Sequence, residues 1–382
     1  MSNMKKTLRR LNLDFETLKT ESLLEALPDG AYITDQTRQI LYWNAAAERI
    51  TRWQSADVVG RSCSDNILVH VDKDQHPLCG QEYCPLHRAM VTGCTSTTPV
   101  LVFAKSKAGH RIPVEVTVAP LRNSEGEVVG GIELFRDMSA TIDDLNRARV
   151  IQSLSVATRL PPDDRLHIRT RYIPHDLVGG DFLRVEQVDR DHYAILVADV
   201  MGHGMAAALY TMQLRSLWEE NRHLLSSPTD FLTVLNRHLH ELSKGDDYFA
   251  TAVHLVANAA DGTVKYAMAG HDHPLLLRAG GKEFDTQKLH GPCLGLLPEA
   301  DFPSNQASMG RGDSLLLFTD GAVEVDGEDG KELGRAGLAR MLAACDCKPD
   351  GNALAQIEEM LVRFNRNIRL EDDLTLVLLT RR

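Results

Sequence analysis

The sequence lacks the features of a membrane, secreted or nucleic-acid-binding protein. No apolar run reaches the roughly 18 residues of a membrane helix, and the early basic cluster Lys5-Lys6 with Arg9-Arg10 is not followed by a signal-peptide core. The net charge of −11 opposes the basic surface of a nucleic-acid binder. An odd count of 7 cysteines favours free thiols or a metal site over a disulfide framework. We therefore expect a cytoplasmic protein.

At 382 residues the chain is long for one hydrophobic core, so two domains are expected. Its sequence pattern divides it into an N-terminal amphipathic helix, a first domain, a helical linker and a second domain. The expected boundaries are 1–24, 25–137, 138–160 and 161–382.

Short strands and one capped helix fill the first domain. Residues 31–34 and 40–43 predict a hairpin, and Asn44 is placed to cap a helix over residues 45–50. Further strands are expected at 98–104, 111–120 and 128–135. An antiparallel sheet with helices is an α+β arrangement.

Four short motifs of this first domain resemble those of a PAS sensory domain. They are Leu27-Pro28-Asp29-Gly30, Trp43-Asn44-Ala45-Ala46-Ala47-Glu48-Arg49, Val59-Gly60-Arg61 and Phe135-Arg136-Asp137-Met138. The resemblance implies an antiparallel sheet with helices that senses a ligand, redox state or light, or that dimerises. Fold alone does not identify the signal.

The linker carries apolar residues at a spacing that suits one helix face. They are Ile142, Leu145, Ala148, Ile151, Leu154 and Ala157. A short coiled coil between two protomers, and hence a homodimer through the PAS domain and linker, is expected. Pro161-Pro162 is expected to end the helix.

Four aspartates in the second domain stand beside glycines or at the ends of apolar runs: Asp181, Asp199, Asp320 and Asp372. Several carboxylates converging at the edge of a sheet suit the all-oxygen sites of Mg²⁺ or Mn²⁺. A pair of such ions activates water for attack on phosphorus. Each aspartate taken singly is equally consistent with a solvated turn residue or a helix cap.

Ordered motifs over residues 160–382 resemble the SpoIIE-type branch of the type-2C, metal-dependent serine/threonine phosphatases. They include Val178-Gly179-Gly180-Asp181-Phe182, Val197-Ala198-Asp199-Val200-Met201-Gly202-His203-Gly204, Ala269-Gly270-His271, Phe318-Thr319-Asp320-Gly321 and Asp372-Asp373-Leu374-Thr375. The resemblance implies an α/β/β/α sandwich. Leu183 and Arg184 depart from the family's aromatic and acidic residues, which puts substrate recognition in doubt but removes none of the four carboxylates.

The same resemblance implies a role for each residue. Asp199 is expected to bridge two Mn²⁺ or Mg²⁺ ions, with the Val200 carbonyl on one of them. Asp320 and Asp372 are expected to bind the other ion, and Asp181 to act mainly through coordinated water. Asp373 is expected to support a ligand or act as a minor one; His203 is expected to pack or support, with general acid catalysis as an alternative.

By resemblance, such phosphatases remove phosphate from a serine of a bacterial STAS-domain anti-anti-sigma protein, which controls a sigma factor by partner switching. A PAS domain ahead of the phosphatase is similar to the stress-response members, so a signal is expected to travel down the linker. Two alternatives stay open. One is a non-catalytic module that binds a phosphorylated partner, and the other is a phosphatase with a different phosphoprotein substrate.

Cysteines gather in the first domain. Cys63, His70, Cys79 and Cys84 combine soft thiolates with an imidazole, which suits Zn²⁺ or an iron–sulfur cluster. A redox-active thiol pair and ordinary buried thiols are the alternatives. The spacing matches no standard zinc signature.

Overall fold

The protein is described from a computed structural model that covers most of the chain. The residues described are 20–73, 75–79, 83–96, 100–156, 160–202, 204–243, 248–279, 283–284, 289–327, 330–348, 351–366 and 370–382. They divide into two compact units, Met1–Asp144 and Leu145–Arg382. Most of the expected N-terminal amphipathic helix lies outside the described residues, and its described end is α2 (Thr20–Glu25).

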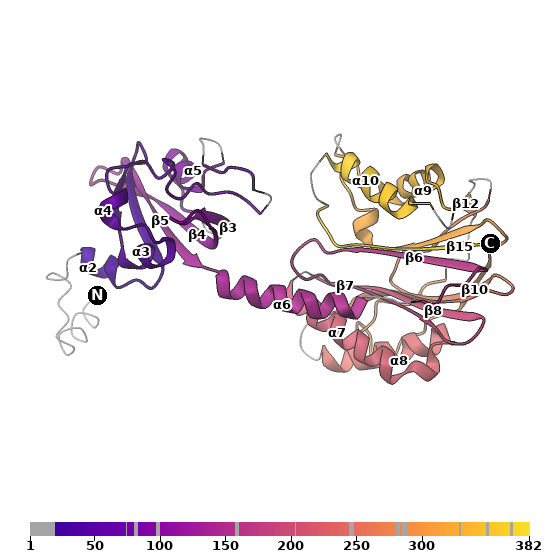
Figure 1. The fold of residues 1–382 in the computed structure, drawn as a ribbon. Coiled ribbons are helices and arrows are strands. Elements are labelled where there is room, and N and C mark those ends of the chain that lie inside the picture. Colours follow the sequence, from indigo (N-terminus) through magenta and orange to yellow (C-terminus); the bar gives the residue numbers. More distant parts are fainter. Residues whose placement is uncertain are drawn as a thin grey trace. The chain divides into compact units, whose positions relative to one another are not determined.

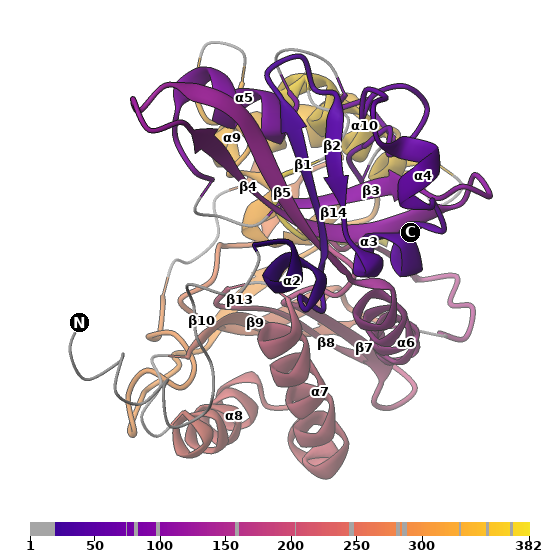
Figure 2. The ribbon, with the colours of Figure 1, turned by 90° about the vertical axis from the view of Figure 1, so that its left-hand side faces the viewer.

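The first unit is built on an antiparallel sheet of five strands in the order β2-β1-β5-β4-β3 (Figure 2). The strands are β1 (Gly30–Asp35), β2 (Ile40–Trp43), β3 (Val100–Lys105), β4 (Arg111–Arg122) and β5 (Val128–Asp137). The helices are α3 (Ala45–Thr51), α4 (Ser55–Val58) and α5 (Pro85–Thr92). The strands and the first helix expected from the sequence are therefore confirmed.

Asn44 shows why the chain turns from strand to helix where it does. Its side-chain oxygen accepts hydrogen bonds from the backbone N–H of Ala47 at 2.8 Å and of Ala31 at 2.9 Å. The first bond caps α3, as predicted, and the second ties the cap to β1. Around it, Tyr32 packs with its ring centroid 5.5 Å from that of Trp43 and 6.4 Å from that of Phe135, so strand, cap and core depend on one another.

The second unit is an α/β/β/α sandwich, as expected (Figure 1). One five-stranded sheet has the order β13-β10-β9-β8-β7 and the other β12-β11-β14-β15-β6. Their strands are β6 (Leu166–Ile173), β7 (Asp181–Gln187), β8 (His192–Val200), β9 (Ala250–Asn258), β10 (Thr263–Ala269), β11 (Leu275–Leu277), β12 (Glu283–Phe284), β13 (Asn305–Ser308), β14 (Ser314–Phe318) and β15 (Leu374–Arg381).

Helices cover the outer face of each sheet (Figure 1). They are α7 (Met205–Glu220) and α8 (Pro228–Leu242) on the first sheet, and α9 (Gly334–Ala344) and α10 (Ala353–Asn365) on the second. Two short 3₁₀ turns, η1 (Arg222–Leu224) and η2 (Asp320–Ala322), complete the unit.

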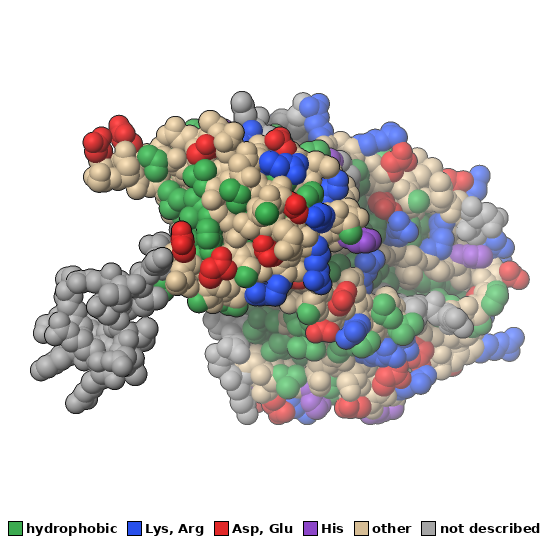
Figure 3. Space-filling view, turned by 60° about the vertical axis from the view of Figure 1, so that its left-hand side comes forward, with side chains coloured by type: hydrophobic (Ala, Val, Ile, Leu, Met, Phe, Trp, Pro, Cys, Tyr) green, Lys and Arg blue, Asp and Glu red, His purple; other side chains and the backbone are tan. Residues whose placement is uncertain are grey.

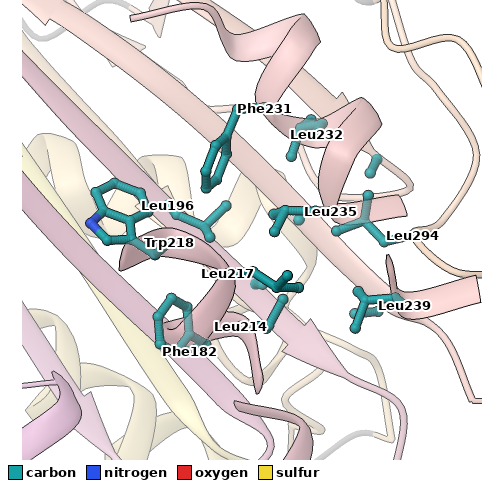
Figure 4. Packing of buried hydrophobic residues seen from close by; sticks show 14 of the residues in the cluster. Phe182, Leu196, Leu214, Leu217, Trp218, Phe231, Leu232, Leu235, Leu239 and Leu294 are labelled. Carbon is teal, nitrogen blue, oxygen red and sulfur yellow. The ribbon is translucent and has the colours of Figure 1, made fainter. Parts of the chain in front are cut away.

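Alternate residues of β8 point to opposite faces of their sheet, which fixes the two inner layers. Ile195 and Val197 enter the core between the sheets, whereas Leu196 packs beneath α7 and α8 against Trp218 and Phe231 (Figure 4). Burying a side chain of this size contributes about 1.5–3 kcal/mol, so both faces of β8 hold the sandwich together. By the same alternation Asp199 points between the sheets, at the end of the strand.

The expected linker helix is α6 (Ser139–Val156), which begins in the first unit and continues in the second. Its side chains Val150, Ile151 and Leu154 are 59%, 60% and 66% exposed. Gln152, on the same helix, is only 4% exposed because it packs into the second unit. The helix therefore has one docked side and one apolar exposed side.

Figure 3 shows Lys and Arg side chains gathered along one side of the first unit, with Asp and Glu scattered over the visible face.

Among the described helices, none is both long and apolar enough to span a bilayer.

Candidate active site

Asp181 and Asp199 lie directly opposite each other on neighbouring strands. The register of the antiparallel pair β7–β8 matches Asp181 with Asp199, so both side chains leave the same face of the sheet. On the other side of β8, Thr251 of β9 is the partner of Asp199. Like charges in such a pair repel, so this edge of the sheet is electrostatically unfavourable without a compensating cation.

The second sheet brings Asp320 and Asp372 to the same edge. Asp320 starts η2 just after β14, and Asp372 just precedes β15. Because β14 and β15 are antiparallel, the end of one strand lies beside the start of the other, and Thr319 N donates to Thr375 O at 3.1 Å. Residues more than fifty positions apart in sequence are thereby joined at one end of the sandwich.

Three of the four predicted aspartates line one cavity of about 450 Å³: Asp199, Asp320 and Asp372. The other lining residues are His175, Asp176, Met201, Gly202, Phe249, Thr251 and Glu371. Five carboxylates and no Lys or Arg are among these described lining residues. The cavity therefore offers hard oxygen donors in a negative environment.

Burial and mutual repulsion show that the cavity fits cations. Burial and the neighbouring Asp320 and Asp372 carboxylates raise the pKa of Asp199 to about 7. Burial and the Asp372 carboxylate raise the pKa of Asp320 to about 6, and the side chains of Asp199 and Asp320 share a hydrogen bond. Divalent ions would remove this cost by neutralising the carboxylates. In the described conformation no three Asp, Glu, His or Cys side chains already stand as a complete metal site.

Asp181 lies behind the cavity. It is 1% exposed, and its Oδ2 accepts from the hydroxyls of Thr319 at 2.8 Å and Thr375 at 2.6 Å. Burial, then the charges of Asp199 and Asp373, raise its pKa well above the usual value. The two threonines fix one oxygen of Asp181, so it suits a role through an intervening water better than open coordination.

Asp373 holds the backbone of the Gly179-Gly180-Asp181 turn. Its Oδ2 accepts from the N–H of Gly180 at 2.6 Å and of Asp181 at 3.3 Å, and its Oδ1 accepts from His175 N at 2.7 Å. A Cβ on Gly179 would stand 2.4 Å from Asp373 Oδ2, so glycine is required for this approach. Asp373 is thus positioned as a support for the turn.

Of the other residues in the predicted motifs, the structure describes Val200 and His271 but not His203. Val200 ends β8, and a Cβ on Gly180 would stand 2.9 Å from its carbonyl oxygen, so the turn and the Val200 carbonyl are in close approach. His203 lies outside the described residues. His271 is 4% exposed, and its Nδ1 lies 2.7 Å from Thr251 Oγ1, which makes it a support for a cavity-lining residue.

Sequence reasoning missed several residues around the site. Thr319 and Thr375 lie in the motifs of Asp320 and Asp372, but no role was predicted for them. A hydroxyl group close in sequence to a predicted metal-binding carboxylate is a signal that could have indicated their supporting role. Gln152 was missed because its contacts join a linker helix to a distant turn. Its amide donates to Gly179 O at 2.7 Å and to Thr211 Oγ1 at 3.1 Å, and its Oε1 accepts from Gly179 N at 3.1 Å.

The four candidate residues of the first unit lie in one region of its core. Cys63, Cys84 and His70 are buried, and Cys79 is half-buried with its Sγ 3.0 Å from His70 N. The structure adds Glu133, which is 1% exposed and 3.6 Å from His70 Nε2. All seven cysteines are free thiols.

Comparisons with known protein families agree with this architecture. A model of the PAS fold matches residues 24–143, and the model of stage II sporulation protein E (SpoIIE) matches residues 189–382. The second match covers half of the chain, so the chain belongs to the SpoIIE family. Its second unit is a protein serine/threonine phosphatase domain of that family. Asp181 precedes the matched range.

Two curated relatives are both named as phosphoserine phosphatases. Phosphoserine phosphatase RsbP of Bacillus subtilis (strain 168) is 32% identical over 186 residues, which are 47% of this chain and 45% of RsbP. Phosphoserine phosphatase RsbU of the same organism is 24% identical over 311 residues, 81% of this chain and 88% of RsbU. The match thus spans less than half of RsbP but most of RsbU.

A solved structure supports the fold. The SiaA-PP2C domain of Pseudomonas aeruginosa superposes with a TM-score of 0.54 at 22% identity, over 64% of this chain and 99% of that domain. At this identity the likeness speaks for the sandwich fold alone.

Proposed function

We propose that the chain is an active phosphoserine phosphatase that depends on Mn²⁺ or Mg²⁺ and is controlled by its PAS domain. The observation that carries the proposal is the convergence of Asp199, Asp320 and Asp372, from both sheets, on one acidic cavity. In a chain of the SpoIIE family this convergence is the expected place for phosphoester hydrolysis.

The residues have separate tasks in this proposal. Asp199 would be shared by two ions, the Val200 carbonyl would help to hold one, Asp320 and Asp372 would hold the other, and Asp181 would act through water. Such a pair of ions supplies an activated water and charge neutralisation for in-line attack on phosphorus.

The protein's own groups keep this arrangement in place. Thr319 and Thr375 fix the Asp181 carboxylate, and Asp373 fixes the glycine turn that carries it. His271 orients Thr251 beside Asp199.

We place the substrate in bacterial partner switching, as the phosphoserine of a small STAS-domain anti-anti-sigma protein. Support comes from the relatives, two of which are phosphoserine phosphatases, and from the PAS domain ahead of the catalytic unit. Such a pathway operates in the cytoplasm and responds to stress.

The linker helix gives the proposed control a physical route. Gln152 holds both the N–H and the C=O of Gly179, two residues before Asp181. A shift of α6 therefore moves the turn that carries Asp181. The exposed Val150 and Leu154, four residues apart on α6, are the proposed contact with a second copy of the chain, which makes the linker a dimer element.

The direct test is Mn²⁺-dependent release of phosphate from a phosphorylated STAS-domain protein. Asp199→Asn should lower kcat/KM by about 10²–10³-fold or more, since one group that stabilises developing charge has about this effect. Asp189→Asn, at the exposed β7–β8 turn, is the matched control and should leave the rate unchanged. Full activity of Asp199→Asn would overturn the proposed chemistry.

The two alternatives are separated by the same assay. A non-catalytic module that binds a phosphorylated partner predicts binding without turnover, even of a generic aryl phosphate with Mn²⁺. A different phosphoprotein substrate predicts turnover of the aryl phosphate but not of the STAS protein. Capture of the phosphorylated partner by the Asp199→Asn variant identifies the true substrate.

A further inference from the structure

The core of the PAS unit contains an unusual group of ionisable side chains. Tyr32, Cys63 and Cys84 belong to its hydrophobic cluster, and His70 and Glu133 are 4% and 1% exposed. Glu133 stands opposite Tyr32 in the β1–β5 register, so both side chains enter the same core. Polar groups in such a position cost free energy unless they are paired.

Two atoms of this group are left without a partner. His70 Nε2 and Glu133 Oε1 are buried and have no hydrogen bond among the described residues. They face each other at 3.6 Å, which is too long for a hydrogen bond. The Tyr32 hydroxyl already bonds to the Glu133 carboxyl. A carboxylate aimed at a histidine nitrogen in this way is the usual partner of a metal-binding histidine, because it fixes the ring for coordination through the other nitrogen.

The thiols lie in the same neighbourhood. Cys79 Sγ accepts a hydrogen bond from the His70 backbone at 3.0 Å, a contact that stabilises negative charge on sulfur. Beyond the effect of burial, the charge of Glu133 adds to the raised pKa of Cys63, Cys79 and Cys84, so all three are within electrostatic reach of one carboxylate. Three thiols and one imidazole form the Cys₃His donor set of structural zinc sites.

The two simpler explanations fit less well. A reactive redox pair needs thiolates, but burial raises the pKa of Cys63 to about 12 and of Cys79 to about 11, so these thiols are poor nucleophiles. Ordinary buried thiols would account for Cys63 and Cys84. They do not account for His70 Nε2 and Glu133 Oε1, two buried atoms beside these thiols that have no hydrogen-bond partner among the described residues.

We propose that Cys63, His70, Cys79 and Cys84 bind one Zn²⁺ ion in the PAS core, with Glu133 as the positioning residue of His70 and Tyr32 as the support of Glu133. In the described conformation no three of these donors surround a common point, so the side chains converge when the ion enters. Each thiol that becomes a ligand releases its proton. The proposal does not depend on phosphatase activity.

The test is the metal content of the full-length chain, purified without chelators and measured by elemental mass spectrometry. One equivalent of zinc per chain is expected in the wild type and none in Cys84→Ser. Cys94→Ser is the matched control, because Cys94 is an exposed thiol of the same unit, and it should keep the full equivalent. Glu133→Gln should still bind zinc, with an affinity about 10–100-fold lower.

A measurement on the wild-type chain guards against misfolded variants. A mercurial that modifies thiols should release the zinc, detected with a colorimetric chelator, and readded Zn²⁺ under reducing conditions should restore one equivalent. A wild-type chain that neither carries nor rebinds zinc overturns the proposal. So does iron with acid-labile sulfide in place of zinc, or zinc that remains in Cys84→Ser. Zinc that disappears in Asp199→Asn belongs to the acidic cavity and equally overturns it.

Discussion

The two units both gather ionisable side chains, but they do so in opposite chemical settings. The acidic cavity of the second unit is open and lined by carboxylates, whereas the group around His70 and Glu133 is buried in an apolar core and rich in thiols. The cavity suits hard, exchangeable ions that take part in a reaction. The buried group suits a soft ion held for structure or sensing.

This contrast shows that the burial of a group of ionisable side chains and the type of its ligand atoms together indicate the role of the group. In the acidic cavity, the Asp320 charge raises the pKa of Asp199, yet both residues line the cavity and are only partly buried. In the PAS core, His70 and Glu133 are removed from water, and His70 Nε2 and Glu133 Oε1 have no hydrogen bond among the described residues. We therefore expect an exchangeable ion in the first arrangement and, under the zinc proposal, a permanent one in the second.

Removing metals should separate the two regions most sharply. Dialysis against EDTA should abolish phosphatase activity, and added Mn²⁺ should restore it, because the carboxylate cavity is open to exchange. The same treatment should leave most of the zinc on the chain until the thiols are modified. Elemental analysis alongside the activity assay checks both. Zinc and activity lost together at the same EDTA concentration would contradict the division.

Loss of the hydrogen bond that supports Asp181 should have the next largest effect. Thr375→Val keeps the side-chain shape but removes the 2.6 Å hydrogen bond to Asp181 Oδ2. We expect the Mn²⁺ concentration for half-maximal activity to rise by about 10–100-fold, as for other partners of metal ligands. Thr233→Val is the control, since that hydroxyl bonds only the carbonyl of its own helix at Thr229. An unchanged Mn²⁺ requirement would remove Asp181 from the metal machinery.

Loss of the contact between the linker helix and the active-site turn should have a smaller effect on the Mn²⁺ requirement. Gln152→Leu removes three hydrogen bonds, two of them to Gly179, so the turn loses its tie to α6. We expect roughly a 5-fold change in the Mn²⁺ requirement, the lower end of coupling between sites. Deletion of residues 1–137 should then change the activity of this variant less than that of the wild type.

Ser153→Ala provides the control for Gln152, because Ser153 is the neighbouring exposed residue and bonds only Val150 O on its own helix. If Gln152→Leu unfolds more readily in urea but keeps its Mn²⁺ requirement, Gln152 serves stability rather than control. The two readouts therefore distinguish a positioning residue from a packing residue.

Local patterns predicted what depends on local chain geometry. The Asn44 cap, the strand before Asp199 and the turn at Asp320 follow from nearby residues, and the structure has all three. The hydrogen bonds from Thr319 and Thr375 to Asp181 span 138 and 194 residues. They arise from the packing of two sheets, which no local pattern encodes.

The PAS core illustrates the same limit. The cysteines and His70 were visible as a cluster in the sequence, but Glu133 lies 63 positions beyond His70 and comes within 3.6 Å of its Nε2 only in the folded unit. The Gln152 contact depends likewise on how α6 docks. Donor types were thus readable from the sequence, whereas their supports required the fold.

A third buried ionisable residue, His254, extends the comparison. We expect its substitution to have no effect on activity. His254 is 0% exposed, packs against Trp218 and Phe231, and has neither ring nitrogen hydrogen-bonded among the described residues. Burial lowers the pKa of His254 to about 3, so the imidazole stays neutral in the folded chain.

The unfolded chain protonates this histidine below about pH 6.5, so folding loses stability as the pH falls from there toward the folded pKa. At pH 5 the loss is about 2 kcal/mol relative to pH 7.5. His254→Leu should remove this part of the pH dependence, so the variant gains stability over the wild type on acidification, measured by urea unfolding at both pH values. His223→Leu, at an exposed position, should not. A parallel loss of stability in the wild type and His254→Leu would mean that His254 finds a proton-accepting partner. The unpaired Nε2 of His70 would then need no metal to explain it either.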